Sequence, residues 1–242
     1  MNNIFFITGA SSDIGVALIE SIKEECVIIA HYNSNEKKLL DLQKSIEHKI
    51  IPIQADFSSN QSIIEMLDKI ELEIGAPNKI IHLAASKYEN ISFKSTNWVD
   101  FQKEFSLSLG SIMQILNRFL PKMAKAKRGR VITMLSSVTL GMPPKALTQY
   151  TTVKYAIWGL MKALASEYAN KKVTVNCISP SMVETQFLSN LDERIVKLTA
   201  ESHPLKRNAV VGDIIPVILM LLSDDSAYIN GVNIPITGGN NI

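Results

Sequence analysis

Hydrophobic residues in this chain gather in short runs that alternate with longer stretches of mixed polarity. The short runs are bounded by turn-forming residues, as buried strands are, and lie at residues 4–8, 27–31, 50–54, 80–83, 130–135, 174–178 and 233–235. The stretches between them have helical periodicity, at residues 15–23, 36–47, 59–74, 97–126, 149–169 and 213–223. This alternation predicts one α/β domain over residues 1–242, with a doubly wound, seven-stranded parallel sheet and helices on both faces.

One stretch, residues 181–208, is too long for an ordinary connection. It follows the carboxyl end of a predicted strand, which is the edge where such sheets bind their ligands. We therefore predict that it forms a lid over a substrate. A helical insertion on the surface is the alternative.

The composition is that of a globular domain, with 46% hydrophobic and 20% charged residues. The longest apolar stretch, residues 214–222, contains Pro216 and is far too short to cross a membrane. The first residues lack the basic and apolar segments of a signal peptide, so we expect a cytoplasmic protein without a membrane partner. A net charge of +2 gives no reason to expect a nucleic acid partner, although it is compatible with an anionic cofactor.

The two cysteines, Cys26 and Cys177, lie in apolar strand-like runs and lack the spacing of metal ligands. The histidines are scattered along the chain as well. We therefore predict two buried thiols and no metal site.

Candidate chemistry begins with Tyr150 and Lys154, which lie four residues apart in a predicted helix. This spacing places a phenol and an ammonium on one face of the helix. A nearby cation favours phenolate over phenol, and such a tyrosine can exchange a proton with a carbonyl or an alcohol near neutral pH. Taken alone, the same spacing also fits a solvated surface pair.

A second signal lies near the start of the chain, where the first predicted strand runs into Thr8-Gly9-Ala10-Ser11-Ser12-Asp13-Ile14-Gly15 and then into a helix. A strand, a glycine-bearing turn and a helix N-terminus let backbone N–H groups approach a pyrophosphate closely. An ordinary tight connection is the alternative. The two signals support each other because they occur in one α/β pattern.

With these two motifs the chain resembles the short-chain dehydrogenase/reductase family, whose marks are a Thr-Gly-x-x-x-Gly-x-Gly turn and a Tyr-x-x-x-Lys pair. The resemblance implies a Rossmann fold and hydride transfer between a nicotinamide cofactor and a carbonyl or alcohol. It also implies that Tyr150 transfers the proton, while Lys154 anchors the nicotinamide ribose and lowers the pKa of Tyr150. The cofactor contacts that it implies are Gly9, Ser11, Ser12, Asp13, Ile14, Gly15, His31, Asn33, Ser34, Asp56, Ala84, Tyr150, Lys154, Ile178 and Thr185.

The family's catalytic serine falls on one of two adjacent residues. Counting from the strand that starts at residue 129 gives Ser136, and counting back from Tyr150 gives Ser137. An inserted residue is tolerated better in the loop 138–148 than in a buried strand, where it would turn every following side chain to the other face. We therefore predict Ser136, whose hydroxyl would hydrogen-bond the substrate oxygen.

The end of the second predicted strand bears on the choice of cofactor. An NAD site places a carboxylate there to accept hydrogen bonds from the ribose 2′-hydroxyl, but residues 31–35 contain no acid. Ser34, Lys37 and Lys38 offer a hydroxyl and positive charge, so we predict NADP(H) rather than NAD(H); solvated lysines are the alternative. Asp56 resembles the residue that faces the adenine amino group, with capping of the helix that follows as the alternative.

Four positions depart from the family pattern. Asp13 replaces the middle glycine of the turn, and its carboxylate is unfavourable beside a pyrophosphate unless it points away or caps the helix that begins at Ile14. The asparagine of the catalytic tetrad, whose backbone kink and bound water relay protons from the lysine, aligns with Ser108. A plain helix residue bonded to a carbonyl one turn earlier is the alternative there. His82-Leu83-Ala84-Ala85 replaces Asn-Asn-Ala-Gly, and Ser181 replaces a glycine in the segment that contacts the nicotinamide carboxamide.

These departures leave two hypotheses: an NADP(H)-dependent oxidoreductase, and a catalytically impaired dinucleotide-binding or scaffolding protein that keeps the fold. The intact Ser136, Tyr150 and Lys154 favour the enzyme. A scaffold has no need of that constellation.

The substrate and the assembly follow only from weaker features. The chain is most similar to the 3-oxoacyl-(acyl-carrier-protein) reductase branch, with the segments 204–207 and 231–239 as support. That branch implies a small carbonyl or acyl thioester substrate, with an acyl carrier protein as a candidate partner. The predicted helices around residues 107–120 and 156–164 carry more apolar surface than one core stripe needs, so we expect a homodimer or homotetramer.

Overall fold

The computed structural model describes residues 3–86 and 90–240. They form one sheet, in the order β3-β2-β1-β4-β5-β6-β7, in which every neighbouring pair is parallel. Its strands are β1 (Asn3–Thr8), β2 (Cys26–Tyr32), β3 (Lys49–Gln54), β4 (Lys79–His82), β5 (Gly129–Met134), β6 (Val173–Pro180) and β7 (Asn233–Ile236). All seven lie where the hydrophobic pattern predicts strands, so the predicted fold class is confirmed.

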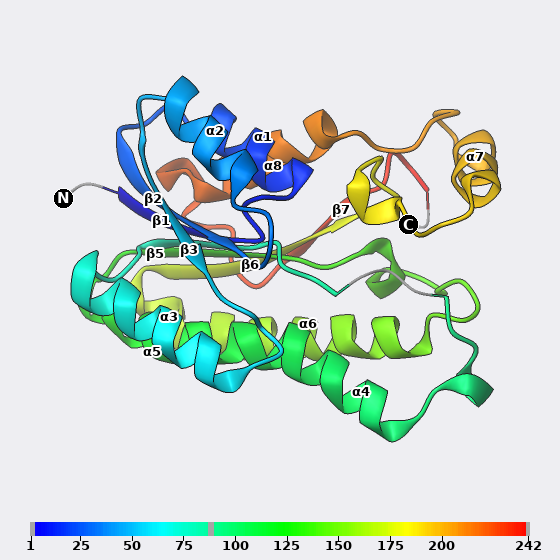
Figure 1. Ribbon diagram of the computed structural model, residues 1–242, viewed down its shortest axis with the longest axis horizontal. Helices are drawn as coiled ribbons and strands as arrows, with labels where there is room; N and C mark the ends of the chain where they lie inside the picture. Colours follow the sequence, from blue (N-terminus) through cyan, green and yellow to red (C-terminus); the bar gives the residue numbers. More distant parts are fainter. Residues whose placement is uncertain (1–2, 87–89, 241–242) are drawn as a thin grey trace.

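Helices cover both faces of the sheet (Figure 1). One layer holds α1 (Asp13–Ser21), α2 (Lys37–Ser45) and α8 (Val211–Leu222), and the other holds α3 (Asn60–Glu73), α5 (Ser111–Ala126) and α6 (Thr148–Tyr168). Successive strand residues point to opposite faces, so Phe5 and Ile28 enter the core under α1, while Phe6 and Ile29 enter the core under α5. The strands are therefore buried on both faces, which explains their continuous apolar runs.

The predicted helix over residues 97–126 is interrupted. α4 (Trp98–Glu104) continues into a π-helical turn, η2 (Phe105–Gly110), and α5 follows directly. A π-helical turn contains an extra residue and occurs frequently at functional sites. Hydrophobic periodicity predicts the helical run but not this extra residue, because the apolar face continues on both sides of it.

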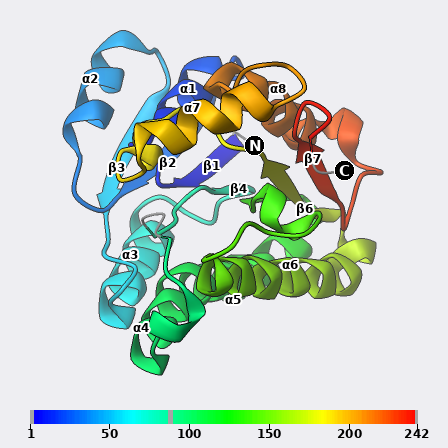
Figure 2. The ribbon, with the colours of Figure 1, turned by 90° about the vertical axis from the view of Figure 1, so that its right-hand side faces the viewer.

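The segment 181–208 contains a short 3-10 turn, η5 (Gln186–Leu188), and a helix, α7 (Glu193–Ser202), as the alternative of a helical insertion expects. α7 lies on the side of the sheet that carries α1 and α8 (Figure 2). The segment is fastened near its two ends, where Val183 and Ala209 form a parallel bridge and the Asn208 amide donates to Glu184 at 3.2 Å.

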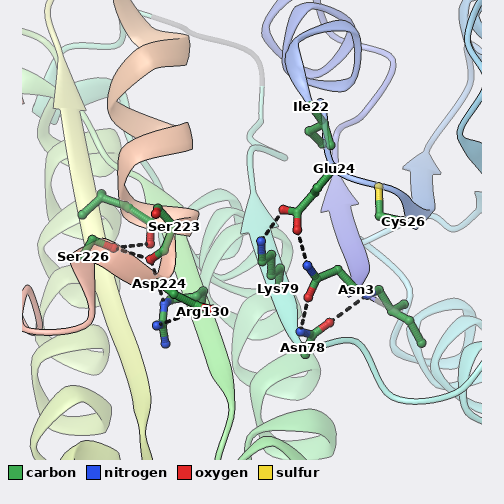
Figure 3. Close-up of polar contacts among 12 residues, drawn as sticks. Asn3, Ile22, Glu24, Cys26, Asn78, Lys79, Arg130, Ser223, Asp224 and Ser226 are labelled. Atoms are coloured by element: carbon green, nitrogen blue, oxygen red, sulfur yellow. Dashed lines mark hydrogen bonds and ion pairs between the residues drawn. The ribbon is translucent and has the colours of Figure 1, made fainter. Parts of the chain in front are cut away.

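Polar side chains form ion pairs and hydrogen bonds at the amino ends of the central strands (Figure 3). Lys79 at the start of β4 forms an ion pair with Glu24. Arg130 in β5 forms one with Asp224 at 3.0 Å. The Asn78 side chain accepts a hydrogen bond from the backbone N–H of Ile4 at 2.7 Å, which fastens β1 at the same edge.

Both cysteines are buried free thiols, as predicted. Across residues 3–86 and 90–240, no helix is long and apolar enough to span a bilayer. In the same part of the chain, no group of three His, Cys, Asp or Glu side chains is placed to hold a metal ion.

Candidate active site

The turn after β1 requires glycine at two positions. Gly9 has a φ of +66°, and a Cβ there would lie 3.0 Å from the backbone nitrogen of Ala84. A Cβ on Gly15 would lie 2.5 Å from the carbonyl oxygen of Ala10, so any side chain would push α1 away from the turn. The first residues of α1 line the cavity described below, which is the arrangement in which a helix N-terminus can bind phosphate.

Ser12 caps α1, and Asp13 does not. The Ser12 hydroxyl accepts a hydrogen bond from the Gly15 N–H at 3.1 Å. The Asp13 carboxylate instead accepts hydrogen bonds from the Lys38 ammonium at 2.9 Å and from the Gln186 N–H at 2.8 Å. Burial raises the pKa of Asp13, but the hydrogen bonds from Gln186 and Lys38 outweigh it and leave the pKa below its usual value. Asp13 therefore links α1 to α2 and to the segment 181–208, and Lys38 compensates its charge.

His31, at the end of β2, supports the glycine turn from the core. Its Nδ1 accepts a hydrogen bond from the Gly9 N–H at 3.2 Å, and its Nε2 donates to the Ala55 carbonyl at 3.0 Å. The ring stacks on Phe57 with a centroid distance of 4.1 Å. Burial lowers the pKa of His31 to about 4, so the ring is neutral at neutral pH. Because both ring nitrogens are engaged, the structure gives this predicted cofactor residue a supporting place beneath the turn.

Polar residues follow β2 at the surface. Asn33 and Ser34 are exposed, and the turn carries no acid at residues 31–35. Lys38 follows in α2, where it faces Asp13. Its ammonium is therefore engaged with the Asp13 carboxylate and also donates to the Gln186 side chain at 3.4 Å.

Asp56, after β3, does not cap the helix that follows. Its Oδ1 accepts hydrogen bonds from the N–H and the hydroxyl of Ser58, at 2.9 and 2.8 Å, and these bonds lower its pKa. The cap of α3 is Ser59, whose hydroxyl accepts from the Ser62 N–H. The capping alternative is therefore wrong, and contact between Asp56 and the adenine stays a prediction.

The other predicted cofactor residues lie at the ends of β1, β4 and β6. The Ala84 N–H donates to Thr8 Oγ1 at 3.2 Å and joins β4 to the turn, in which Ser11 is half-buried. Thr185 lines the cavity just before η5. Ile178 is buried in the core of the sheet, so its side chain packs there and does not line the cavity.

His82 replaces the family's asparagine at the end of β4. The Thr8 hydroxyl accepts hydrogen bonds from the N–H groups of Leu83 and Ala84, so its own proton points to His82 Nδ1 at 2.9 Å. The ring proton of His82 then resides on Nε2, which is buried and has no hydrogen-bond partner among the described residues. Burial lowers the pKa of His82 to about 3, and the positive charge of Lys154 adds to the effect.

Tyr150 and Lys154 lie together near the start of α6, with Lys154 Nζ 5.5 Å from the centroid of the Tyr150 ring. Lys154 is buried and donates a hydrogen bond to the carbonyl of Met134 at 2.9 Å, at the end of β5. Burial lowers the pKa of Lys154 to about 8, although the negative charge of Glu104 opposes this effect. Lys154 is thus buried and Tyr150 is half-buried, so the two do not form a solvated surface pair.

Ser136 and Ser137 both line the cavity directly after β5. The Ser136 hydroxyl accepts a hydrogen bond from the Val138 N–H at 3.4 Å and caps a short 3-10 turn. Its backbone is extended, in continuation of the strand. The choice of Ser136 as the catalytic serine stays a prediction.

Ser108 is buried within the π turn η2. Its hydroxyl donates to Oε1 of Glu104 at 2.7 Å, so it bonds to a carboxylate and not to the backbone carbonyl that the alternative requires. Sequence reasoning missed Glu104. The only signal was its place four residues before Ser108, on the same helical face, and the role of that pair depends on contacts with a distant helix.

These elements meet at a cavity of about 410 Å³, a size typical of small-molecule sites. The glycine turn, the residues after β5, the start of α6 and the lid segment each contribute to its wall. Apolar side chains from the segment 181–208, Phe187 and Ile195 among them, line the same cavity as Tyr150 and Lys154. The predicted residues that it brings together are Ser12, Asp13, Ile14, Ser136, Tyr150, Lys154 and Thr185.

Similarity to known proteins extends over nearly the whole chain. The family model described as enoyl-(acyl carrier protein) reductase matches residues 9–241. Nodulation protein G of Azospirillum brasilense is 28% identical, over 98% of this chain and 98% of its own length. A 3-oxoacyl-(acyl-carrier-protein) reductase of Pseudomonas aeruginosa is also 28% identical, over 98% of this chain and 96% of that protein. A solved reductase of the same name from Agrobacterium tumefaciens has a TM-score of 0.88 at 22% identity, over 98% of this chain and 93% of that chain.

Proposed function

This chain belongs to the short-chain dehydrogenase/reductase family, in its 3-oxoacyl-(acyl-carrier-protein) reductase-like branch, and on that premise we propose that it reduces a carbonyl group with NADPH and that Tyr150 donates the proton. The observation that carries the proposal is the meeting of Tyr150, Lys154 and the glycine turn at one cavity. An impaired dinucleotide-binding or scaffolding protein has no comparable observation in its favour.

The residues present fit a dinucleotide. Gly9 and Gly15 let the turn pack closely against the backbone of Ala84 and Ala10, and the start of α1 then forms part of the cavity wall. Lys38 balances the charge of the Asp13 carboxylate at the start of α1. We assign the backbone of Ser12 and the start of α1 to the pyrophosphate, and Lys154 to the nicotinamide ribose. The bound nicotinamide supplies the hydride.

NADP(H) is the form that this site favours. The acid-free end of β2 does not repel a 2′-phosphate, and Lys37 and Lys38 add positive charge nearby in sequence. The solved Agrobacterium tumefaciens reductase of the same fold is described with NADP bound, which agrees with this choice.

The proposed proton transfer follows from the positions of three side chains. As the carbonyl carbon is reduced, its oxygen gains negative charge, which the Ser136 hydroxyl stabilises by a hydrogen bond. Tyr150 gives that oxygen its proton. The Lys154 ammonium, held by the Met134 carbonyl, favours the phenolate that remains.

An acyl thioester suits the cavity, because an apolar chain can lie against the lid segment while the carbonyl reaches Tyr150. The relatives named 3-oxoacyl-(acyl-carrier-protein) reductase support this class of substrate. Lys206 and Arg207 are the basic residues of the segment 204–207 that we consider for contact with an acidic carrier protein. The charge of Arg207 is paired with Asp213 at 2.6 Å, whereas Lys206 donates to the backbone carbonyl of Glu201 at 3.0 Å. Lys206 is therefore the better candidate for that contact.

Steady-state NADPH oxidation by the full chain tests the proposal. The substrates are a 3-oxoacyl thioester of coenzyme A, the same acyl group on an acyl carrier protein, and a simple ketone. We expect turnover with the thioesters above the rate of a Tyr150→Phe background. NADPH binding without turnover on any of them would contradict the proposed reaction while leaving the cofactor site intact.

A homodimer or homotetramer and a cytoplasmic location remain predictions. Exposed apolar side chains on the outer faces of α5 and α6, such as Met113 and Tyr155, are compatible with an interface between copies. Sedimentation of the purified chain decides the oligomeric state.

A further inference from the structure

Glu104 lies where α4 enters the π turn, and its carboxylate is fixed there. The buried Ser108 hydroxyl donates to Glu104 Oε1 at 2.7 Å, and Glu104 itself is half-buried. This junction packs on α6, and the Gln149 side chain at the start of α6 donates to the Asp100 carbonyl in α4 at 3.1 Å. The carboxylate is therefore held on the helical segment that lies against the helix of Lys154.

Lys154 has few other groups to balance its charge. Tyr150 faces it from its own helix, His82 from β4 and Cys177 from β6. His82 is neutral because burial lowers its pKa to about 3, and the Cys177 thiol is neutral because burial raises its pKa. Among the described residues, Glu104 is the one carboxylate whose charge acts on Lys154. It does so at a distance, since no carboxylate in this part of the chain forms an ion pair with Lys154.

We propose that Glu104 is a positioning residue of this enzyme: its carboxylate, clamped by Ser108, is the counter-charge that keeps the buried Lys154 ammonium protonated beside Tyr150. An ammonium buried without a nearby negative charge loses its proton more easily, because burial disfavours the charged form. The short Ser108 hydroxyl suits this arrangement, since it reaches the Glu104 carboxylate one turn away. The inference rests on the proposed role of Lys154 in the reaction.

The direct test is a nuclear magnetic resonance titration of the full chain with ¹³C-labelled lysine side chains. The Lys154 signal is identified by its absence in Lys154→Met. We expect it to titrate near pH 8 in the natural protein and about one pH unit lower in Glu104→Gln. Glu104→Asp keeps the charge and should restore part of the shift. This readout needs neither substrate nor turnover, so it does not depend on the proposed reaction.

The matched control is Glu65→Gln on α3. Glu65 is exposed and accepts a hydrogen bond from Gln61, four residues away, so it repeats the chemistry of the Glu104 and Ser108 pair far from Lys154. The Lys154 titration should be unchanged in this variant. Where thermal unfolding shows that Glu104→Gln does not fold, Glu104→Met removes the same charge with a good helix former.

Kinetics provide a second readout. In Glu104→Gln, Lys154 loses its proton at a lower pH. The alkaline limb of the plot of kcat against pH therefore moves to lower pH as well. We expect kcat of Glu104→Gln to fall about fivefold at pH 8 and hardly at all at pH 6, from the charged fraction of Lys154. A purely structural role would lower kcat equally at both pH values. Titration of Lys154 at the same pH in Glu104→Gln, or in Glu104→Met, as in the natural protein would overturn the inference.

Discussion

Buried charged side chains have different partners at the two edges of the sheet. At the amino edge, Lys79 pairs with Glu24 and Arg130 pairs with Asp224 (Figure 3). At the carboxyl edge, Lys154 is buried with a backbone carbonyl as its hydrogen-bond acceptor, and His82 Nε2 has no hydrogen-bond partner among the described residues. Both edges lie within one sheet and share the same strands.

The difference separates stability from chemistry. A charged group in an ion pair stays in one protonation state and stabilises the fold. An incompletely paired buried group has a shifted pKa and can exchange a proton. The ion pairs of Lys79 and Arg130 therefore lie at the edge of the sheet away from the cavity. At the carboxyl edge, Lys154 is near its titration point, with a pKa of about 8.

Substitution of one lysine at each edge gives the largest expected contrast. Lys154→Met should lower kcat by about 10²–10⁴ and weaken NADPH binding, because the ammonium serves both Tyr150 and the ribose, while the unfolding free energy stays equal or rises. Lys79→Met should leave kcat nearly unchanged and lower the unfolding free energy by about 1–2 kcal/mol, a range reduced because Glu24 is part-exposed.

Both variants are measured by denaturant unfolding and by steady-state kinetics. The comparison between the edges breaks down if Lys79→Met loses activity without losing stability. It also breaks down if Lys154→Met unfolds as readily as Lys79→Met.

Acid should destabilise the protein through its neutral histidines. The pKa values of His31 and His82 are lowered to about 4 and about 3, so the unfolded chain binds more protons below pH 6.5 and stability falls as the pH drops. Between pH 6.5 and pH 5 each histidine lowers the unfolding free energy by about 1.5 kcal/mol. Denaturant unfolding at several pH values measures the loss, and His82→Asn should remove about half of it.

His48 supplies the control for this experiment. It is part-exposed, and its Nε2 bonds to the Ile22 carbonyl at 2.8 Å, near the amino edge. Unfolding of His48→Gln at the same pH values controls for the loss of a histidine outside the core. A stability that stays flat from pH 6.5 to pH 5 would show that the two buried rings accept protons in the folded protein.

The smallest expected effect concerns the cofactor. NADPH should bind more tightly than NADH by at least about tenfold, or roughly 1.4 kcal/mol, because residues 31–35 carry no acid against a 2′-phosphate. A fluorescence titration at fixed ionic strength measures both affinities. Equal or reversed affinities would mean that Asp13 offsets the positive charge of Lys38.

The fold was predictable because each strand is buried on both faces and therefore stands out as an apolar run. The glycine turn and the pair of Tyr150 and Lys154 were predictable for a similar reason, since each is a local pattern. The partners of Asp13 were not, because Lys38 and Gln186 reach it from distant segments. The role of Glu104 was not predictable for the same reason. Glu104 lies only four residues before Ser108 in the sequence, but its effect on Lys154 exists only in the folded chain.

The most direct test of the central claim, that the carboxyl-edge cavity transfers a proton through Tyr150, is the comparison of Tyr150→Phe with Tyr155→Phe. Tyr155 lies on the same helix and is 45% exposed, so it controls for the loss of a phenolic hydroxyl from α6. The account predicts that Tyr150→Phe loses about 10²–10⁴ in kcat and keeps its NADPH affinity, while Tyr155→Phe keeps both. Substantial turnover in Tyr150→Phe would contradict it.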